Sequence, residues 1–185
     1  MSSLDPDQRH TLIDALGDAQ RIGMLGPGDL GPAVDQAVAL ARLIPENAAS
    51  FVDLGSGGGL PGLVVAVARP ELSGLLVDRR GKRVDLLVRL IGRLGLTGRV
   101  QAVEADVIDL PRRYPGATWS VATSRGFGSP AYTAQHAAPL LAPGGHLLVT
   151  EPPGSAGERW NSPEVRQFGL ALVAVADGIA VLTRS

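Results

Sequence analysis

The sequence has no cysteine, so disulfide bridges, thiolate metal sites and cysteine nucleophiles are excluded. Aromatic residues make up only 4% of the chain, which excludes a platform of stacked aromatic rings as the main binding device. No apolar run approaches the roughly 20 residues of a membrane-spanning helix. The first ten residues are polar and acidic, unlike a secretory signal. These absences predict a soluble, cytoplasmic protein with no bound metal and no membrane partner.

Charge is distributed unevenly along a chain whose formal net charge is −1. Residues 1–50 carry seven acidic residues against three arginines, a local balance of −4. Residues 79–125 carry ten basic residues against four acidic ones, a local balance of +6. The second region predicts a basic surface that suits an anionic partner such as nucleic acid, although a solvated helix face has the same composition.

The stretch 51–62, FVDLGSGGGLPG, has the pattern of a buried strand, a glycine-rich turn and the start of a helix. Five glycines fall among residues 55–62. Because glycine has no Cβ, such a turn brings the backbone close to a bound cofactor. We therefore interpret this turn as a cofactor-binding loop.

Apolar periodicity and breaker residues predict the remaining elements. Strands are predicted at 51–54, 74–78, 99–103, 120–123, 146–150, 171–176 and 179–183. Helices are predicted at 5–23, 33–44, 61–68, 82–94 and 131–141. Asp177-Gly178 between the last two strands is a hairpin signal.

This order of elements predicts an α/β fold with a doubly wound, mostly parallel sheet. The C-terminal hairpin is expected to add antiparallel strands at one edge. An N-terminal helical extension, residues 1–47, is predicted to precede the main domain, residues 48–185.

Two glycine spacings in the turn favour different cofactors. Gly57, Gly59 and Gly62 match the G-x-G-x-x-G of dinucleotide-binding loops. The first glycine of that motif should directly follow the strand, however, and here that glycine is Gly55. In this second spacing Asp53 lies just inside the strand end, where an acid disfavours a pyrophosphate. An acid there suits the cationic sulfonium and amino group of S-adenosyl-L-methionine (SAM).

Acidic residues also follow the next two strands. Asp78 ends the second predicted strand, where an acid accepts hydrogen bonds from ribose hydroxyls. NAD and SAM share that contact, so Asp78 does not separate them. Asp106 follows the third strand, where it either accepts a hydrogen bond from an adenine amino group or caps a short helix at 107–110.

Four segments occur in order along the chain: DLGSGGGLPG at 53–62, RPE at 69–71, GKRVDLL at 81–87 and TSRGFGSP at 123–130. Together they resemble the bacterial 16S ribosomal RNA guanine-N7 methyltransferases, the RsmG or GidB family. The resemblance covers roughly residues 51–149. It implies a class I, Rossmann-like SAM-dependent methyltransferase, with S-adenosyl-L-methionine as the cofactor and ribosomal RNA or the small ribosomal subunit as the partner.

The resemblance and the chosen spacing assign roles to individual residues. The predicted cofactor-binding residues are Asp53, Gly55, Gly57, Leu60, Asp78, Asp106, Val107, Ile108 and Arg125. Arg125, which faces the cofactor and substrate pocket in this interpretation, is also the predicted catalytic residue. After the fifth strand the family carries a lysine-glycine pair, whereas this chain has Glu151-Pro152-Pro153, for which we expect a rigid lid or turn.

Guanine N7 has a free lone pair and no proton to lose, so its methylation requires positioning and electrostatics but no general base. No histidine–carboxylate pair stands out in the sequence, and His136 and His146 are expected to be structural. The predicted function is SAM-dependent methylation of guanine N7 in 16S ribosomal RNA. The alternatives are a divergent paralogue that methylates a small molecule or another RNA, an NAD(P)-binding oxidoreductase, and a catalytically silent SAM-binding or RNA-binding module.

Overall fold

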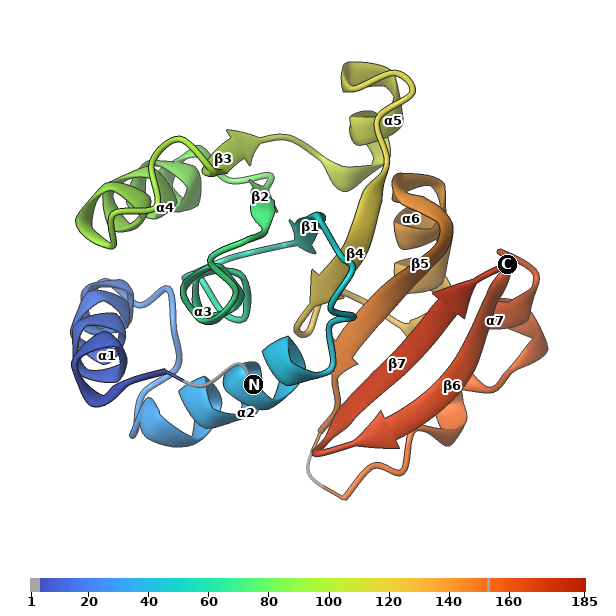
Figure 1. Cartoon of the computed structure of the whole chain (residues 1–185), viewed down its shortest axis with the longest axis horizontal. Coiled ribbons are helices and arrows are strands. Elements are labelled where there is room, and N and C mark those ends of the chain that lie inside the picture. Colours follow the sequence, from blue (N-terminus) through green and yellow to red (C-terminus); the bar gives the residue numbers. More distant parts are fainter. Residues whose placement is uncertain (1–3, 153) are drawn as a thin grey trace.

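The computed structural model describes residues 4–152 and 154–185. Within these residues, seven strands form one sheet in the order β3-β2-β1-β4-β5-β7-β6 (Figure 1). The strands are β1 (Ser50–Leu54), β2 (Ser73–Asp78), β3 (Val100–Glu104), β4 (Trp119–Ser124), β5 (Leu141–Thr150), β6 (Leu170–Ala176) and β7 (Ile179–Arg184). Strands β1 to β5 are parallel, and β7 pairs antiparallel with both β5 and β6. The predicted fold class is confirmed.

Helices cover both faces of this sheet. The α-helices are α1 (Pro6–Arg21), α2 (Gly31–Arg42), α3 (Gly62–Ala68), α4 (Gly81–Arg93), α5 (Leu110–Arg113), α6 (Pro130–Ala137) and α7 (Pro163–Arg166). Successive strand residues point to opposite faces. Phe51 accordingly joins the apolar cluster beneath α1 to α4, and Val52 joins the cluster beneath α5 to α7. None of the helices in the described residues is long and apolar enough to cross a membrane.

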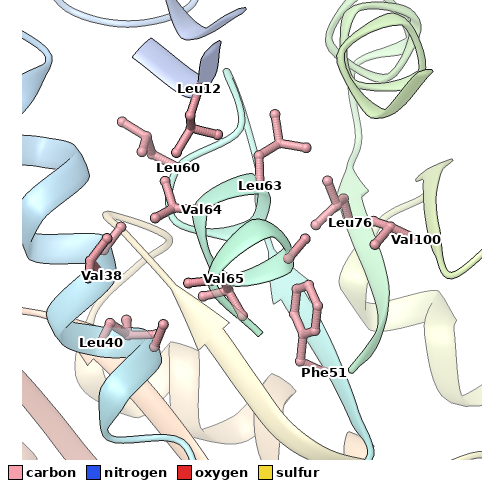
Figure 2. Packing of buried hydrophobic residues seen from close by; sticks show 14 of the residues in the cluster. Leu12, Val38, Leu40, Phe51, Leu60, Leu63, Val64, Val65, Leu76 and Val100 are labelled. Carbon is pink, nitrogen blue, oxygen red and sulfur yellow. The ribbon is translucent and has the colours of Figure 1, made fainter. Parts of the chain in front are cut away.

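The first cluster is continuous from the N-terminal helices to the sheet. Figure 2 shows Leu12 of α1 and Val38 of α2 on one side of α3, and Phe51 and Leu76 of the strands on the other. All four side chains are buried. Helices α1 and α2 therefore share their core with the main sheet, and the domain boundary at residue 47 stays a prediction.

Arg69, just after α3, ties α2 to this core. Its side chain is buried, and Nη1 donates hydrogen bonds to the carbonyls of Ala41 (3.0 Å) and Ile44 (2.8 Å). Its Nη2 donates to the carbonyl of Pro45 (3.0 Å). The last carbonyls of a helix have no partner within the helix, so the guanidinium satisfies groups that would otherwise need water.

The structure corrects two predicted elements. The helix predicted at 131–141 ends at Ala137 and continues as a 3₁₀ turn, η2 (Ala138–Leu140), because Pro139 has no N–H to donate to an α-helical partner. The fifth strand begins at Leu141, five residues before its predicted start at His146, because Leu141 pairs with Trp119 before the register shifts. Pro153, part of the predicted lid, lies outside the described residues.

Candidate active site

A cleft of about 490 Å³ lies at the carboxyl ends of the parallel strands. Its walls come from the loops after β1, β2, β3 and β4. The chain runs from β1 outward to β3, then returns to β4 on the other side of β1. Ligands of open α/β sheets bind at such a reversal of strand order. The lining residues are Gly55, Val77, Asp78, Arg79, Arg80, Arg83, Ala105, Asp106, Val107, Gly126, Phe127, Gly128, Ser129 and Tyr132.

Gly55 begins the glycine-rich loop with a φ of +70°, a conformation that side chains disfavour. A Cβ on Gly55 would also lie 2.9 Å from Cδ2 of Phe127. The absence of a side chain therefore lets the loop pass under the Phe127 ring at the cleft wall. Gly55 thus lines the cleft, and its contact with a cofactor stays a prediction.

Ser56 fixes the loop to the neighbouring strand, a role that the sequence did not reveal. Its hydroxyl donates to the carbonyl of Asp53 (3.0 Å) and accepts from the N–H of Val77 (3.1 Å). Its own N–H donates to the carbonyl of Val77 (2.9 Å). The buried serine thus continues the sheet pairing past the end of β1, and it fixes the position of the glycine-rich loop.

Asp78 is buried at the cleft wall with a nearly complete set of hydrogen bonds. Its Oδ2 accepts from the N–H of Gly57 (2.9 Å) and from Nη1 of Arg83 (3.2 Å). Its Oδ1 accepts from the N–H of Arg80 (3.0 Å). Gly57 therefore contributes to the site by orienting Asp78, and its own position is outside the cleft lining.

Asp53 lies behind the loop and is completely buried. Burial raises the pKa of Asp53 to about 6, although the hydroxyl of Thr123 donates to Oδ1 (2.6 Å) and opposes the rise. Its Oδ2 has no hydrogen-bond partner among the described residues. The carboxyl group thus sits at the base of the site without lining the cleft.

The other predicted residues divide between the cleft and its surroundings. Asp106 and Val107 line the cleft, whereas Ile108 is exposed and outside it. The Oδ1 of Asp106 accepts from the N–H of Ile108 (3.1 Å), and so caps the 3₁₀ turn η1 (Val107–Asp109). Leu60 packs into the apolar cluster beneath α1 and α2 (Figure 2).

Arg125 lines a second cavity of about 710 Å³ that adjoins the cleft. The two spaces share the wall formed by residues 126–128, which follow β4. Arg125 is exposed and makes no hydrogen bond or ion pair with the described residues. Helix α2, the end of β5 and the β6–β7 turn supply the other walls, so this cavity lies between the N-terminal helices and the C-terminal hairpin.

Aromatic side chains at the cleft were missed in the sequence. Phe127 and Tyr132 both line it, with ring centroids 5.5 Å apart. Low aromatic content excluded an extended platform, but a count says nothing about where the few rings lie. The motif TSRGFGSP contains Phe127, and this was the signal that could have identified it.

The ionisable side chains that line the two spaces are carboxylates, arginines and one tyrosine. No histidine of the described residues lines the cleft or the second cavity. The described residues also contain no cluster of three or more His, Asp or Glu side chains arranged to hold a metal ion. His146 lies away from the cleft, in a pocket that Pro45, Asn47 and Ala48 before β1 also line, and burial lowers the pKa of its imidazole.

Comparison with known proteins identifies the family. The model of the family described as rRNA small subunit methyltransferase G (GidB) matches residues 33–159. The chain belongs to this family. The predicted resemblance and enzyme class are therefore confirmed, and a methyltransferase is favoured over an NAD(P)-binding oxidoreductase.

Relatives in this family match most of the chain. Ribosomal RNA small subunit methyltransferase G of Salinispora arenicola is 32% identical over 169 residues, which are 82% of this chain and 69% of that protein. The protein of the same name from Acidiphilium cryptum is 34% identical over 174 residues, 85% of this chain and 77% of that protein.

Solved structures share the fold at lower sequence identity. An O-methyltransferase family protein from Burkholderia thailandensis superimposes with a TM-score of 0.65 at 21% identity, over 97% of this chain and 61% of that one. A cofactor-bound protein from MTB gives a TM-score of 0.65 at 16% identity, over 94% and 89% of the two chains. At such identities the likeness extends to the fold alone.

Proposed function

We propose that this methyltransferase transfers the methyl group of SAM to N7 of a guanine in the RNA of the small ribosomal subunit. Family membership supports the ribosomal RNA substrate. One structural observation carries the rest of the proposal. The cleft that contains Gly55, Asp78 and Asp106 opens beside a second cavity, and residues 126–128 form a wall of both.

The residues of the cleft suit SAM. Gly55 leaves room beside Phe127, and Oδ1 of Asp78 accepts a single N–H, which leaves it free to accept from a ribose hydroxyl. A second ribose hydroxyl would replace the Arg83 hydrogen bond at Oδ2. Asp106 and Val107 would border the adenine. Bound SAM supplies an electrophilic methyl group on a positively charged sulfur.

The electrostatics of the site suit a cationic cofactor. The carboxyl of Asp53 lies behind the loop with Oδ2 unpartnered among the described residues, and its charge is poorly screened because it is buried. Phe127 and Tyr132 add aromatic rings, whose faces attract cations. These groups would attract a sulfonium placed beside them, while Arg79, Arg80 and Arg83 also line the cleft, where Nη1 of Arg83 donates to Asp78.

The methyl acceptor needs no base in this arrangement. Guanine N7 has a free lone pair and no proton to lose, so it would accept the methyl group without help from a base. The chain positions the two reactants and excludes water. The absence of a histidine from the two lined spaces of the described residues agrees with such a reaction. Arg125, exposed and unpartnered among the described residues, would contact the anionic RNA.

Calorimetric titration with SAM and with NAD tests the cofactor. We expect SAM to bind and NAD to give no heat. Asp78→Ala should weaken SAM binding by about 10-fold to 100-fold, the range for hydrogen bonds to a charged group. Asp85→Ala, on the exposed face of α4 and outside the cleft, is the matched control. Binding of NAD without binding of SAM would overturn the proposal.

Transfer of labelled methyl groups to small ribosomal subunits tests the substrate. Subunits come from a strain that lacks this protein, and the modified base is located by its 7-methylguanine chemistry. We expect one guanine to be methylated by the wild-type chain and no guanine by Asp78→Ala at limiting SAM. If the subunits of the deletion strain already carry the modification, the paralogue that acts on another substrate is favoured.

A further inference from the structure

The second cavity contains a fixed arginine whose role neither the family nor the cofactor explains. Arg159 belongs to the 3₁₀ turn η3 (Glu158–Trp160), far in sequence from the glycine-rich loop, and it lines the cavity together with Arg125 and Glu151. Its side chain is 42% exposed, whereas the side chain of Glu151 is 0% exposed. Arg159 is therefore accessible from the cavity, whereas its partner Glu151 is buried.

Glu151 holds the guanidinium of Arg159 by one edge. The Nε of Arg159 donates to Oε2 of Glu151 (3.0 Å), and Nη2 donates to Oε1 (2.5 Å). Trp160 Nε1 donates to Oε1 (2.7 Å), and the hydroxyl of Ser155 donates to Oε2. Burial alone would raise the pKa of Glu151, but these hydrogen bonds hold it below its ordinary value. Both carboxylate oxygens of Glu151 thus accept hydrogen bonds, and they orient Arg159, Trp160 and Ser155.

The outer edge of the same guanidinium is free. Nη1 of Arg159 donates no hydrogen bond to the described residues, and the cation lies 5.5 Å from the centroid of the Trp160 ring. Arg125 also reaches the cavity, but nothing in the described residues orients it. Of the two arginines, only Arg159 is prearranged to recognise a group at a defined position.

A fixed donor at this place can distinguish purines. Guanine and adenine both present N7, and they differ at position 6, where guanine has the acceptor O6 and adenine has a donor amino group. Arginine offers only N–H donors. We propose that Arg159 is the residue that selects guanine, by donating from its outer edge to O6 while Glu151 positions it. This inference rests on the proposed function, because it concerns the acceptor base of the same reaction.

Nucleotide binding tests this selection without turnover. The probes are GMP, IMP and AMP, added to the chain saturated with S-adenosylhomocysteine. The signal is the fluorescence of Trp160, measured in a Trp119→Phe background that leaves one tryptophan. IMP retains O6 and lacks the 2-amino group, so we expect GMP and IMP to bind alike and AMP about 10-fold to 100-fold more weakly.

Variants of the pair separate selection from folding. Arg159→Gln should remove the preference for GMP over AMP, because an amide both donates and accepts. Glu151→Gln should reduce the preference by a smaller factor, as expected for a positioning residue. The double variant, Glu151→Gln with Arg159→Gln, avoids leaving the buried carboxylate of Glu151 without the cation of Arg159. Arg166→Gln, on exposed α7 and outside both spaces, is the control and should retain the preference.

Methylation of unmodified small subunits gives a second readout. Arg159→Gln is expected to lose about 10-fold to 100-fold in kcat/KM while its affinity for SAM stays that of the wild type. Equal binding of GMP and AMP by the wild type, or a preference that survives Arg159→Gln, overturns the inference. Absence of methylation by a wild type that still prefers GMP overturns the ribosomal substrate and leaves the role of Arg159 supported.

Discussion

The cleft and the second cavity are built from different kinds of contact. The cleft is formed by loops at the ends of adjacent strands, and buried backbone hydrogen bonds through Ser56 and Asp78 hold it rigid. The second cavity is formed by side chains from α2, the end of β5, η3 and the β6–β7 turn. A fixed backbone suits a cofactor that every turnover shares, whereas charged side chains suit an acceptor that must be distinguished from similar bases. Substitutions in the two regions should therefore fail in different ways.

Gly55→Val should have the largest effect, and it should damage the cleft alone. The positive φ and the approach of Phe127 together cost about 3 to 4 kcal/mol of strain, and if the loop moves to relieve it, SAM affinity falls by up to roughly 100-fold to 1,000-fold. Calorimetry measures this loss. Gly92→Val, on α4 with open space around it, is the control, and it should leave SAM binding unchanged. Equal losses in both variants would show that Gly55 has no special role.

Asp53→Asn should stabilise the protein at high pH and weaken its hold on SAM. The pKa of Asp53 is about 6 in the folded chain, above its ordinary value of 3.8, so between these pH values the folded state binds a proton that the unfolded state has lost. The free energy of unfolding therefore falls as pH rises from 4 to 6, and well above pH 6 the charged carboxylate costs about 3 kcal/mol. Thermal unfolding at pH 5 and pH 8 should show the variant gaining mainly at pH 8. A gain that is equal at both pH values would contradict the assigned pKa.

Asp106→Ala should have a moderate effect, split between binding and stability. Loss of the proposed adenine contact should weaken SAM binding by about 5-fold, and loss of the cap on η1 should cost about 1 kcal/mol of stability. Asp109→Ala removes only an exposed ion pair with Arg112, so it serves as the matched control. An Asp106 variant that loses stability but keeps its SAM affinity would assign the residue to capping alone.

Arg93→Gln should have the smallest effect, because its charges lie outside both regions. Arg93 on α4 pairs with Asp14 and Asp18 on α1, and all three side chains are at least one-third exposed. Exposed pairs contribute up to about 1 kcal/mol and are weakened by salt. Chemical denaturation at low and high salt should show a small loss that salt removes, with SAM binding intact. A large loss of stability at high salt would show that Arg93 contributes more than an exposed ion pair.

The sequence predicted the fold well because its signals are local. Apolar runs and glycine breaks located both ends of each of β1 to β4 to within one residue. Asp177-Gly178 located the hairpin. The prediction failed at Leu141–Gly145, where pairing with β4 extends a strand through turn-forming residues. Pairing between distant segments leaves no mark in a local pattern.

The candidate site was predictable only in part for the same reason. Gly55, Asp78 and Asp106 each follow a strand, so the edge at which they meet is set by the topology. The environment of Arg159 depends on Glu151 and Trp160 being brought together by an irregular segment, which no periodicity predicts. The burial of Asp53 was likewise hidden, because a strand-end acid has the same spacing whether it faces the ligand or the core.

The hydrogen bonds of Arg69 make the N-terminal helices hard to remove. A fragment that started at residue 48 would lack the carbonyls of Ala41, Ile44 and Pro45, and it would leave the guanidinium of a buried side chain without these acceptors. Only the ion pair with Glu71 would remain for this guanidinium, and the loss of hydrogen bonds to a charged group costs about 1.5 to 3 kcal/mol. A fragment without α2 should therefore be less stable than the whole chain, and the smallest working unit of this enzyme includes α2.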